Sequence, residues 1–161
     1  MDDELLGFAK ELGERLKAGK LKLALAESCT GGMAAQYITA IAGSSAWFDC
    51  GFVTYSNQSK QRMLNVPDKI LEKYGAVSEQ TAIAMADGAL KNSQADIVGS
   101  ITGIAGPDGG TADKPVGTVC FAWAGKDFKT ISSTELFKGN RQKIRRQAVQ
   151  HLMANLIKML A

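Results

Sequence analysis

The stretch that decides the fold is LKLALAESCTGG, residues 21–32. Its first half alternates weakly and then becomes apolar, which is typical of a buried strand. The two glycines at its end form a turn, and residues 33–42 have the apolar spacing of a helix. A strand, a turn and a helix in this order form the repeating unit of α/β domains.

The rest of the chain extends this unit in both directions. Apolar spacing predicts further helices over residues 4–18, 58–64, 79–91 and 141–161, the second capped by Asn57 and the third by Ser78. Strands are predicted over residues 51–55 and 97–104, and a hairpin over 116–123 and 128–137. The sequence therefore predicts one domain, residues 1–161, with a three-layer α/β/α fold and a mixed sheet of about five to six strands.

Composition and charge exclude several classes of protein. The 161 residues are 45% hydrophobic and 22% charged, which is ordinary for a globular domain. A net charge of +3 is too small to indicate nucleic-acid binding by itself. The acidic N-terminus lacks a signal-peptide pattern, and no stretch approaches the ~20 apolar residues of a membrane span. We therefore expect a cytoplasmic protein with neither nucleic-acid nor membrane partners.

The sequence offers few metal ligands. Cys29, Cys50 and Cys120 are odd in number and widely separated, which fits neither a disulfide framework nor zinc-ligand spacing. His151 is the only histidine. We therefore expect no metal site, and reduced, partly buried thiols, because a free cysteine usually packs as a small hydrophobic residue.

Ser28 stands at the end of the first predicted strand. Ligands of open α/β sheets bind outside the carboxyl ends of the strands, so this position favours a functional role. The following glycines allow backbone N–H groups to approach a substrate at a helix N-terminus. The alternative is that Ser28 or Thr30 only caps the next helix, and residue propensity alone favours capping.

A serine nucleophile needs a base, and Lys60 is the best candidate. With Asn57 as N-cap, Lys60 is the third residue of its helix, where the helix dipole disfavours an ammonium. Burial in a cleft would lower the pKa of this lysine further, as a general base requires. The alternative is an ordinary solvated lysine, which is far more common. His151 is a poor candidate, because it lies deep in the last helix.

A basic segment, KGNRQKIRR at residues 138–146, begins the last helix. Positive charge there opposes the helix dipole, and no acidic residue follows Glu135 to offset it. A phosphate bound by one or two arginines would explain the arrangement. The alternative is a solvated basic face that salt screens.

Several motifs together resemble one known family. They are AESCTGG (26–32), AGSS (42–45), GFVTYSN (51–57), GAVS (75–78), TGIAGPDGG (102–110) and KPVGTV (114–119). In this order they are similar to the C-terminal domain of the competence/damage-inducible protein CinA, over nearly the whole chain. The glycine-rich loop alone, residues 103–110, matches neither the dinucleotide-binding nor the Walker pattern.

The resemblance implies an activity and a site. It implies hydrolysis of the carboxamide of nicotinamide mononucleotide in pyridine nucleotide salvage, without metal or cofactor, by a chain that self-associates. Ser28 would be the nucleophile, Lys60 its base, and Tyr55 an aid to proton transfer. The remaining implied substrate contacts are Thr102 and Gly103 beside the carboxamide, backbone donors of the turn at Thr30, Gly31 and Gly32, and Arg141 or Arg145 at the 5′-phosphate.

Two other interpretations compete with the amidase. A binding module that holds a nucleotide or phosphate without turning it over would keep the basic helix and the glycine loops, and would make Lys60 incidental. Hydrolysis of a different amide, or of a nucleotide-sugar pyrophosphate bond, is the second. The pyrophosphate reaction usually needs a divalent metal and clustered carboxylates, and the scattered acids do not suggest these.

Overall fold

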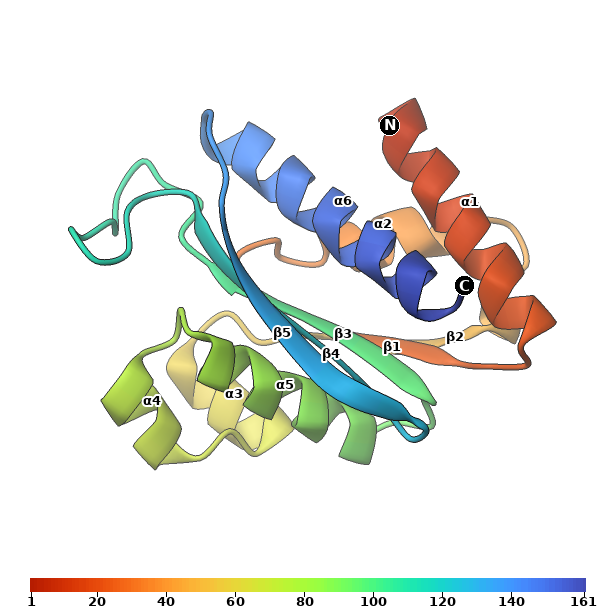
Figure 1. Cartoon of the computed structure of the whole chain (residues 1–161), viewed down its shortest axis with the longest axis horizontal. Helices are drawn as coiled ribbons and strands as arrows, with labels where there is room; N and C mark the ends of the chain where they lie inside the picture. The colour runs from red at the N-terminus through yellow and green to blue at the C-terminus, as the bar shows by residue number, and fades with distance from the viewer.

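A five-stranded sheet lies between two layers of helices (Figure 1). The computed structural model describes residues 1–161. The helices are α1 (Asp3–Ala18), α2 (Met33–Thr39), the 3₁₀ helix η1 (Ser44–Ala46), α3 (Asn57–Leu64), α4 (Asp68–Tyr74), α5 (Glu79–Lys91) and α6 (Arg141–Met159). The strands are β1 (Leu23–Glu27), β2 (Phe48–Val53), β3 (Ile97–Gly103), β4 (Thr118–Gly125) and β5 (Phe128–Leu136). No helix combines the length and the apolar character that crossing a bilayer requires.

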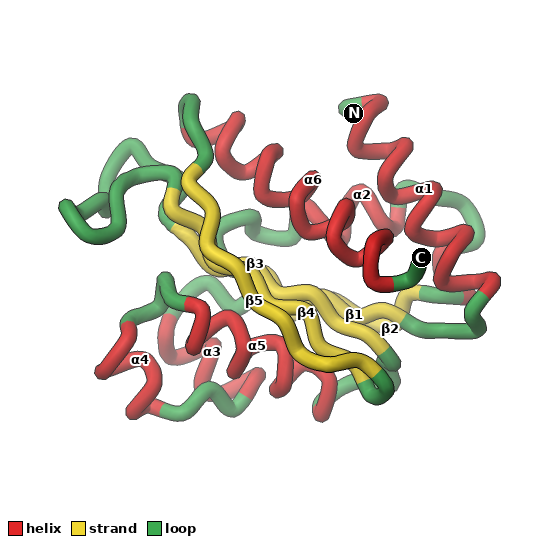
Figure 2. The backbone as a smooth tube through the Cα atoms, in the orientation of Figure 1, coloured by secondary structure: helices red, strands yellow, loops and turns green.

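Helices from the two ends of the chain form one layer, and helices from its middle form the other. Helices α1, α2 and α6 cover one face of the sheet, and α3, α4 and α5 cover the other (Figures 1 and 2). The sheet is mixed, because β1 runs parallel to β2 and β3, whereas β4 is antiparallel to both β3 and β5. The predicted three-layer α/β/α fold with a mixed sheet of five to six strands is confirmed, with five strands.

The strand order creates a crevice at one end of the sheet. The order is β2-β1-β3-β4-β5, so the chain leaves β1 toward one side to form β2 and returns on the other side as β3. Open α/β sheets bind ligands at such a point, outside the carboxyl ends of the strands that diverge. Ser28 directly follows β1 at this point.

Alternating side chains of the central strands divide the core into two clusters. In β1, Leu23 and Leu25 face the α1–α6 side, while Ala24 and Ala26 face the α5 side. In β4, the alternate residues Val119, Phe121 and Trp123 likewise point large side chains toward α6. Since successive residues of a strand point to opposite faces, this pattern sets a small-residue face on which α5 packs closely.

Two local expectations were wrong, and one helix was missed. Strand β2 begins at Phe48 and ends before Tyr55, because its half-buried residues alternate from Phe48 onward, as on a strand with one covered face. Ser56, not Asn57, caps α3, and its hydroxyl accepts the amide proton of Ser59. Helix α4 was not predicted, because only Leu71 of its seven residues is buried and the sequence shows almost no apolar period.

Helix α3 packs closely against α5 at one glycine of α5, Gly88. A Cβ at Gly88 of α5 would lie 1.9 Å from the Leu64 carbonyl oxygen at the end of α3. The obstacle is backbone, which cannot rotate away as a side chain can. Gly88 therefore permits the close approach that fixes α3, the helix that carries Lys60.

Gly88→Ala is expected to lower the free energy of unfolding by about 1–3 kcal/mol, the usual cost of forcing an extra methyl group into a packed core. Gly7→Ala is the matched control, because Gly7 lies in helix α1 with no atom near its potential Cβ. This control should gain about 0.5–1 kcal/mol from the better helix propensity of alanine. Urea denaturation of both variants measures the difference, and equal stability of the two would contradict the α3–α5 contact.

Candidate active site

Ser28 is held between the two strands that flank β1. Its amide donates to the Ile101 carbonyl at 3.0 Å, and the Thr54 amide donates to the Glu27 carbonyl at 2.9 Å. These bonds continue the parallel ladders to β3 and β2 by one step. The Ser28 side chain is buried, with 7% of the residue exposed. The hydroxyl group is therefore fixed by the sheet and not by a mobile loop.

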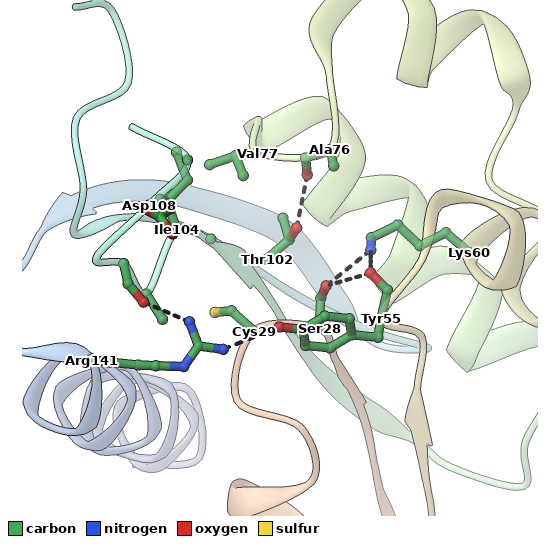
Figure 3. Close-up of a pocket in the computed structure, with 14 residues that line it drawn as sticks. Ser28, Cys29, Tyr55, Lys60, Ala76, Val77, Thr102, Ile104, Asp108 and Arg141 are labelled. Carbon is green, nitrogen blue, oxygen red and sulfur yellow. Dashed lines mark hydrogen bonds between the residues drawn. The ribbon is translucent and has the colours of Figure 1, made fainter. Parts of the chain in front are cut away.

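Lys60 lies against Ser28. Its side chain comes from the first turns of α3, and the residue is only 1% exposed. The ammonium nitrogen Nζ lies 2.9 Å from Ser28 Oγ, and it donates to the carbonyls of Thr54 at 2.8 Å and Tyr55 at 3.1 Å (Figure 3). The alternative of a solvated surface lysine is therefore wrong.

The hydrogen bonds of Lys60 define what its neutral form can do. A neutral amine has two N–H donors and one lone pair. The carbonyls of Thr54 and Tyr55 accept the two donors, which leaves the lone pair for the proton of the Ser28 hydroxyl. Burial lowers the pKa of Lys60 from 10.5 to about 8, and no carboxylate forms an ion pair with it. The neutral form is thus well populated in mildly alkaline solution.

Cys29 is adjacent to Ser28 and also lines the cavity. Burial, reinforced by the negative charge of Glu27, raises the pKa of its thiol to about 12. The thiol is therefore protonated at neutral pH, and a protonated thiol is a poor nucleophile. Of the two adjacent side chains, the Ser28 hydroxyl is therefore the one that contacts a potential base, the amine of Lys60.

The cavity beside this pair has a volume of about 260 Å³. The carboxyl ends of β1 and β3, the segment between β2 and α3, and the start of α6 all contribute to it. Six residues expected from the sequence line it together: Ser28, Tyr55, Lys60, Thr102, Gly103 and Arg141. Thr102 is turned toward the α4–α5 loop, where its hydroxyl donates to the Ala76 carbonyl at 2.8 Å (Figure 3).

Arg141 crosses the mouth of the cavity opposite the Ser28–Lys60 pair. Its guanidinium donates to the Gly106 carbonyl at 2.6 Å and to the Tyr55 hydroxyl at 3.1 Å (Figure 3). It has no carboxylate partner. Tyr55 itself is 62% exposed, and its carbonyl, not its hydroxyl, contacts Lys60.

The turn after Ser28 does not enter the cavity as expected. Thr30, Gly31 and Gly32 are not among the cavity-lining residues. The start of α2 already holds an anion, because the Glu27 carboxylate accepts from the Thr30 hydroxyl and from the amides of Ala34 and Ala35. Neither Ser28 nor Thr30 caps this helix, so the capping alternative is wrong; the N-cap is Gly32.

Two backbone amides beside Ser28 remain free. The Gly31 amide donates to the Ser28 carbonyl at 3.0 Å. The amides of Cys29 and Thr30 donate to no acceptor within the protein. Of these two residues only Cys29 lines the cavity, because Thr30 is fully buried. A free donor next to a nucleophile is what an oxyanion needs.

The basic residues of α6 have three different environments. Arg141 lines the cavity, whereas Arg145 donates to the carbonyls of Cys29 and Thr30 and does not line it. Arg146 pairs with Asp2 and Glu4 near the N-terminus. No acid follows Glu135 in the sequence, but two acids from the opposite end of the chain offset the charge of Arg146. The segment is therefore not a uniform solvated basic face.

Several cavity residues were not among the expected site residues. Val77 comes from the α4–α5 loop, and Asp108 comes from the glycine-rich loop after β3. Gly103 was expected beside the substrate, and its lack of a side chain also has a packing reason: a Cβ there would lie 2.8 Å from Val119. His151 is remote from the cavity and packs against the rings of Phe121 and Trp123. No three His, Cys, Asp or Glu side chains gather as a metal site would require.

The fold and the site together define an α/β domain with a buried serine–lysine pair at the carboxyl ends of parallel strands. The chain belongs to the CinA C-terminal domain family, whose sequence profile matches residues 6–160. The resemblance seen in the sequence motifs is thereby confirmed.

Similar proteins cover almost the whole chain. Nicotinamide-nucleotide amidohydrolase PncC of Escherichia coli (strain K12) is 50% identical over 155 residues, which span 96% of this chain and 94% of that protein. The protein of the same name from Enterobacter agglomerans is 55% identical over 138 residues, which span 86% of this chain and 84% of that protein. The crystal structure of the competence/damage inducible protein CihA from Agrobacterium tumefaciens superposes with a TM-score of 0.94 at 40% identity, over 98% of this chain and 96% of that chain.

The lowered pKa of Lys60 predicts a pH dependence of stability. Between about pH 8 and 10.5 the unfolded chain keeps a proton on Lys60 that the folded protein has released, so stability contributed by this group rises with pH. Lys60→Met should lack this rise. Comparing the urea midpoints of wild type and variant near pH 7 and near pH 10 isolates it, because the opposing effect of the Cys29 thiol is common to both proteins. Parallel curves would show that Lys60 titrates normally.

Proposed function

We propose that this protein hydrolyses the carboxamide of nicotinamide mononucleotide to nicotinic acid mononucleotide and ammonia. The observation that carries the proposal is the amine of Lys60, buried without a counter-ion and 2.9 Å from Ser28 Oγ, in a cavity at the strand ends. The substrate is suggested by the names of the similar enzymes from Escherichia coli and Enterobacter agglomerans.

The reaction follows from the geometry of the pair. The neutral Lys60 amine takes the Ser28 proton as Oγ attacks the amide carbon, and the carbonyl electrons move onto oxygen. The free amide of Cys29, which lines the cavity, would stabilise this oxyanion. The C–N bond then breaks, and the Lys60 ammonium gives its proton to the leaving nitrogen, which departs as ammonia. Water, deprotonated by the same amine, releases the acid and restores Ser28.

The other end of the substrate is assigned to Arg141. Of the two arginines expected at the 5′-phosphate, only Arg141 lines the cavity. Its two present acceptors are neutral, so a phosphate dianion would compete well for the guanidinium. The cavity volume of about 260 Å³ is below the roughly 300–1,000 Å³ of most ligand pockets, which suits the reacting ring while the phosphate lies at the mouth.

The wider proposal concerns the setting of the reaction. The reaction would serve pyridine nucleotide salvage in the cytoplasm, with the chain as one domain in a homo-oligomer, and without metal, cofactor, membrane or nucleic acid. A non-catalytic nucleotide-binding module is disfavoured by one observation. A binding module gains nothing from a buried lysine without a counter-ion, because such a group is costly to desolvate and contacts the serine instead of a ligand.

Ser28→Ala and Lys60→Ala are expected to abolish ammonia release from nicotinamide mononucleotide. The loss in kcat for Lys60→Ala should reach about 10²–10⁴, the usual contribution of a general base. Lys69→Ala is the control, because Lys69 is exposed on α4 away from the cavity. Chelator should leave wild-type turnover unchanged. A folded wild type that binds the nucleotide and releases no ammonia would support the binding module.

The pH profile gives an independent test. Only the neutral amine of Lys60 accepts a proton, so kcat/KM should rise with pH and reach half its plateau near the lowered pKa of about 8. Steady-state rates between about pH 6 and 10 measure it. A profile that falls over this range would assign the activity to a protonated group instead.

A further inference from the structure

The turn that follows Ser28 is held from two sides by charged side chains that the reaction does not use. We propose that Arg145 and Glu27 are positioning residues, which together fix this turn so that the amide of Cys29 stays free and correctly oriented for the oxyanion. The inference rests on the proposed amide hydrolysis. It assigns Arg145 a role in the rate of acylation and not in binding the phosphate.

Glu27 holds the turn from within the fold. Its residue is 1% exposed, and its carboxylate accepts from the Thr30 hydroxyl at 2.6 Å and from the amides of Ala34 and Ala35 at 3.0 Å each. These three donors belong to the turn and to the first residues of α2. An anion so placed compensates the helix start, and it leaves no unfilled anion site there for a substrate.

Arg145 holds the turn from α6. Its Nε donates to the Cys29 carbonyl at 3.2 Å, and its Nη2 donates to the Thr30 carbonyl at 3.0 Å. Its Nη1 donates to the Gln142 side chain at 3.1 Å. All three nitrogens of the guanidinium are therefore engaged within the protein. Arg141, in contrast, is bonded to both walls of the cavity itself.

The planarity of the peptide bond converts these contacts into an orientation of the free Cys29 amide. In a trans peptide, the carbonyl of one residue and the N–H of the next point in opposite directions. The bond from Arg145 to the Thr30 carbonyl therefore fixes the N–H of Gly31. The bond from the Gly31 amide to the Ser28 carbonyl fixes the N–H of Cys29 in the same way. Gly31 permits this turn with its φ of +59°.

A substrate pair separates positioning from phosphate binding. Nicotinamide mononucleotide and nicotinamide riboside carry the same carboxamide, and only the first has a phosphate. Arg145→Ala should lower kcat for both substrates by the same factor, on the order of 10², with KM changed little, because a misoriented oxyanion donor slows the chemical step. The matched variant Arg141→Ala should raise KM for the nucleotide much more than KM for the riboside, so that the preference for the phosphorylated substrate is lost. A loss in Arg145→Ala that is confined to the nucleotide would overturn the inference.

Rescue experiments test the role of each charged group. Added guanidinium ion should restore part of the kcat of Arg145→Ala, whereas Arg145→Lys should stay impaired, because an ammonium cannot reach two carbonyls in fixed geometry. Glu27→Gln should lower kcat with KM unchanged. If Glu27→Gln does not fold, the arginine measurements still decide the question.

A reaction that needs no nucleotide distinguishes this inference from the proposed function. A small uncharged fluorophosphonate forms a bond from its phosphorus to Ser28 Oγ and expels fluoride, and intact-mass spectrometry follows the rate. Arg145→Ala should react more slowly by a factor similar to its loss in kcat, and guanidinium ion should restore the rate. If the wild type and Arg145→Ala differ in this labelling but the wild type releases no ammonia, the proposed substrate is wrong and the positioning role of Arg145 stands. Absence of wild-type labelling, or equal labelling of Arg145→Ala, would overturn the inference.

Discussion

The structure depends on the burial of one amine. A lysine buried without a carboxylate partner is tolerated if its pKa is low enough for the amine to become neutral, or if its N–H groups find acceptors. Lys60 meets both conditions. The two carbonyls that accept from it belong to consecutive residues after β2, and the helix that carries it is pressed onto α5. The Lys60 amine is therefore held against the Ser28 hydroxyl by three features: the end of β2, the cap of α3 and the Gly88 contact.

The positive charges around the site have different tasks because their partners differ. Arg146 is neutralised by acids of the N-terminal segment, so it ties α6 to α1. Arg141 and Arg145 donate only to neutral acceptors, so no acidic side chain offsets their charge near the strand ends. One meets the cavity and the other meets the backbone beside it. The start of α6 thus places one arginine at the cavity and another on the turn after Ser28, although the sequence alone presents them as one cluster.

Sequence patterns predicted what depends on local order. The buried β1, the capped α5, the terminal hairpin and the three-layer arrangement all follow from apolar periodicity and turn residues, and Ser28 and Lys60 follow from position and family resemblance. Patterns failed where tertiary contacts decide. Helix α4 buries only one residue. Ser56 caps α3 in place of the neighbouring Asn57. The carboxylate of Glu27 occupies the start of α2, where the glycines had suggested a substrate site. None of these outcomes has a periodic signal.

The separation of the site residues along the chain has a consequence for folding. Lys60 and Ser28 are 32 residues apart, and Arg145 is 116 residues from Cys29. Contacts of such span close large loops, and their entropy must be lost before the contact can repay it. Helices and the β4–β5 hairpin form from near neighbours, whereas Ser28 meets Lys60, and the turn after it meets Arg145, only when distant segments come together. The assembled site is therefore a late property of the folding chain, and partly folded forms rich in secondary structure lack it.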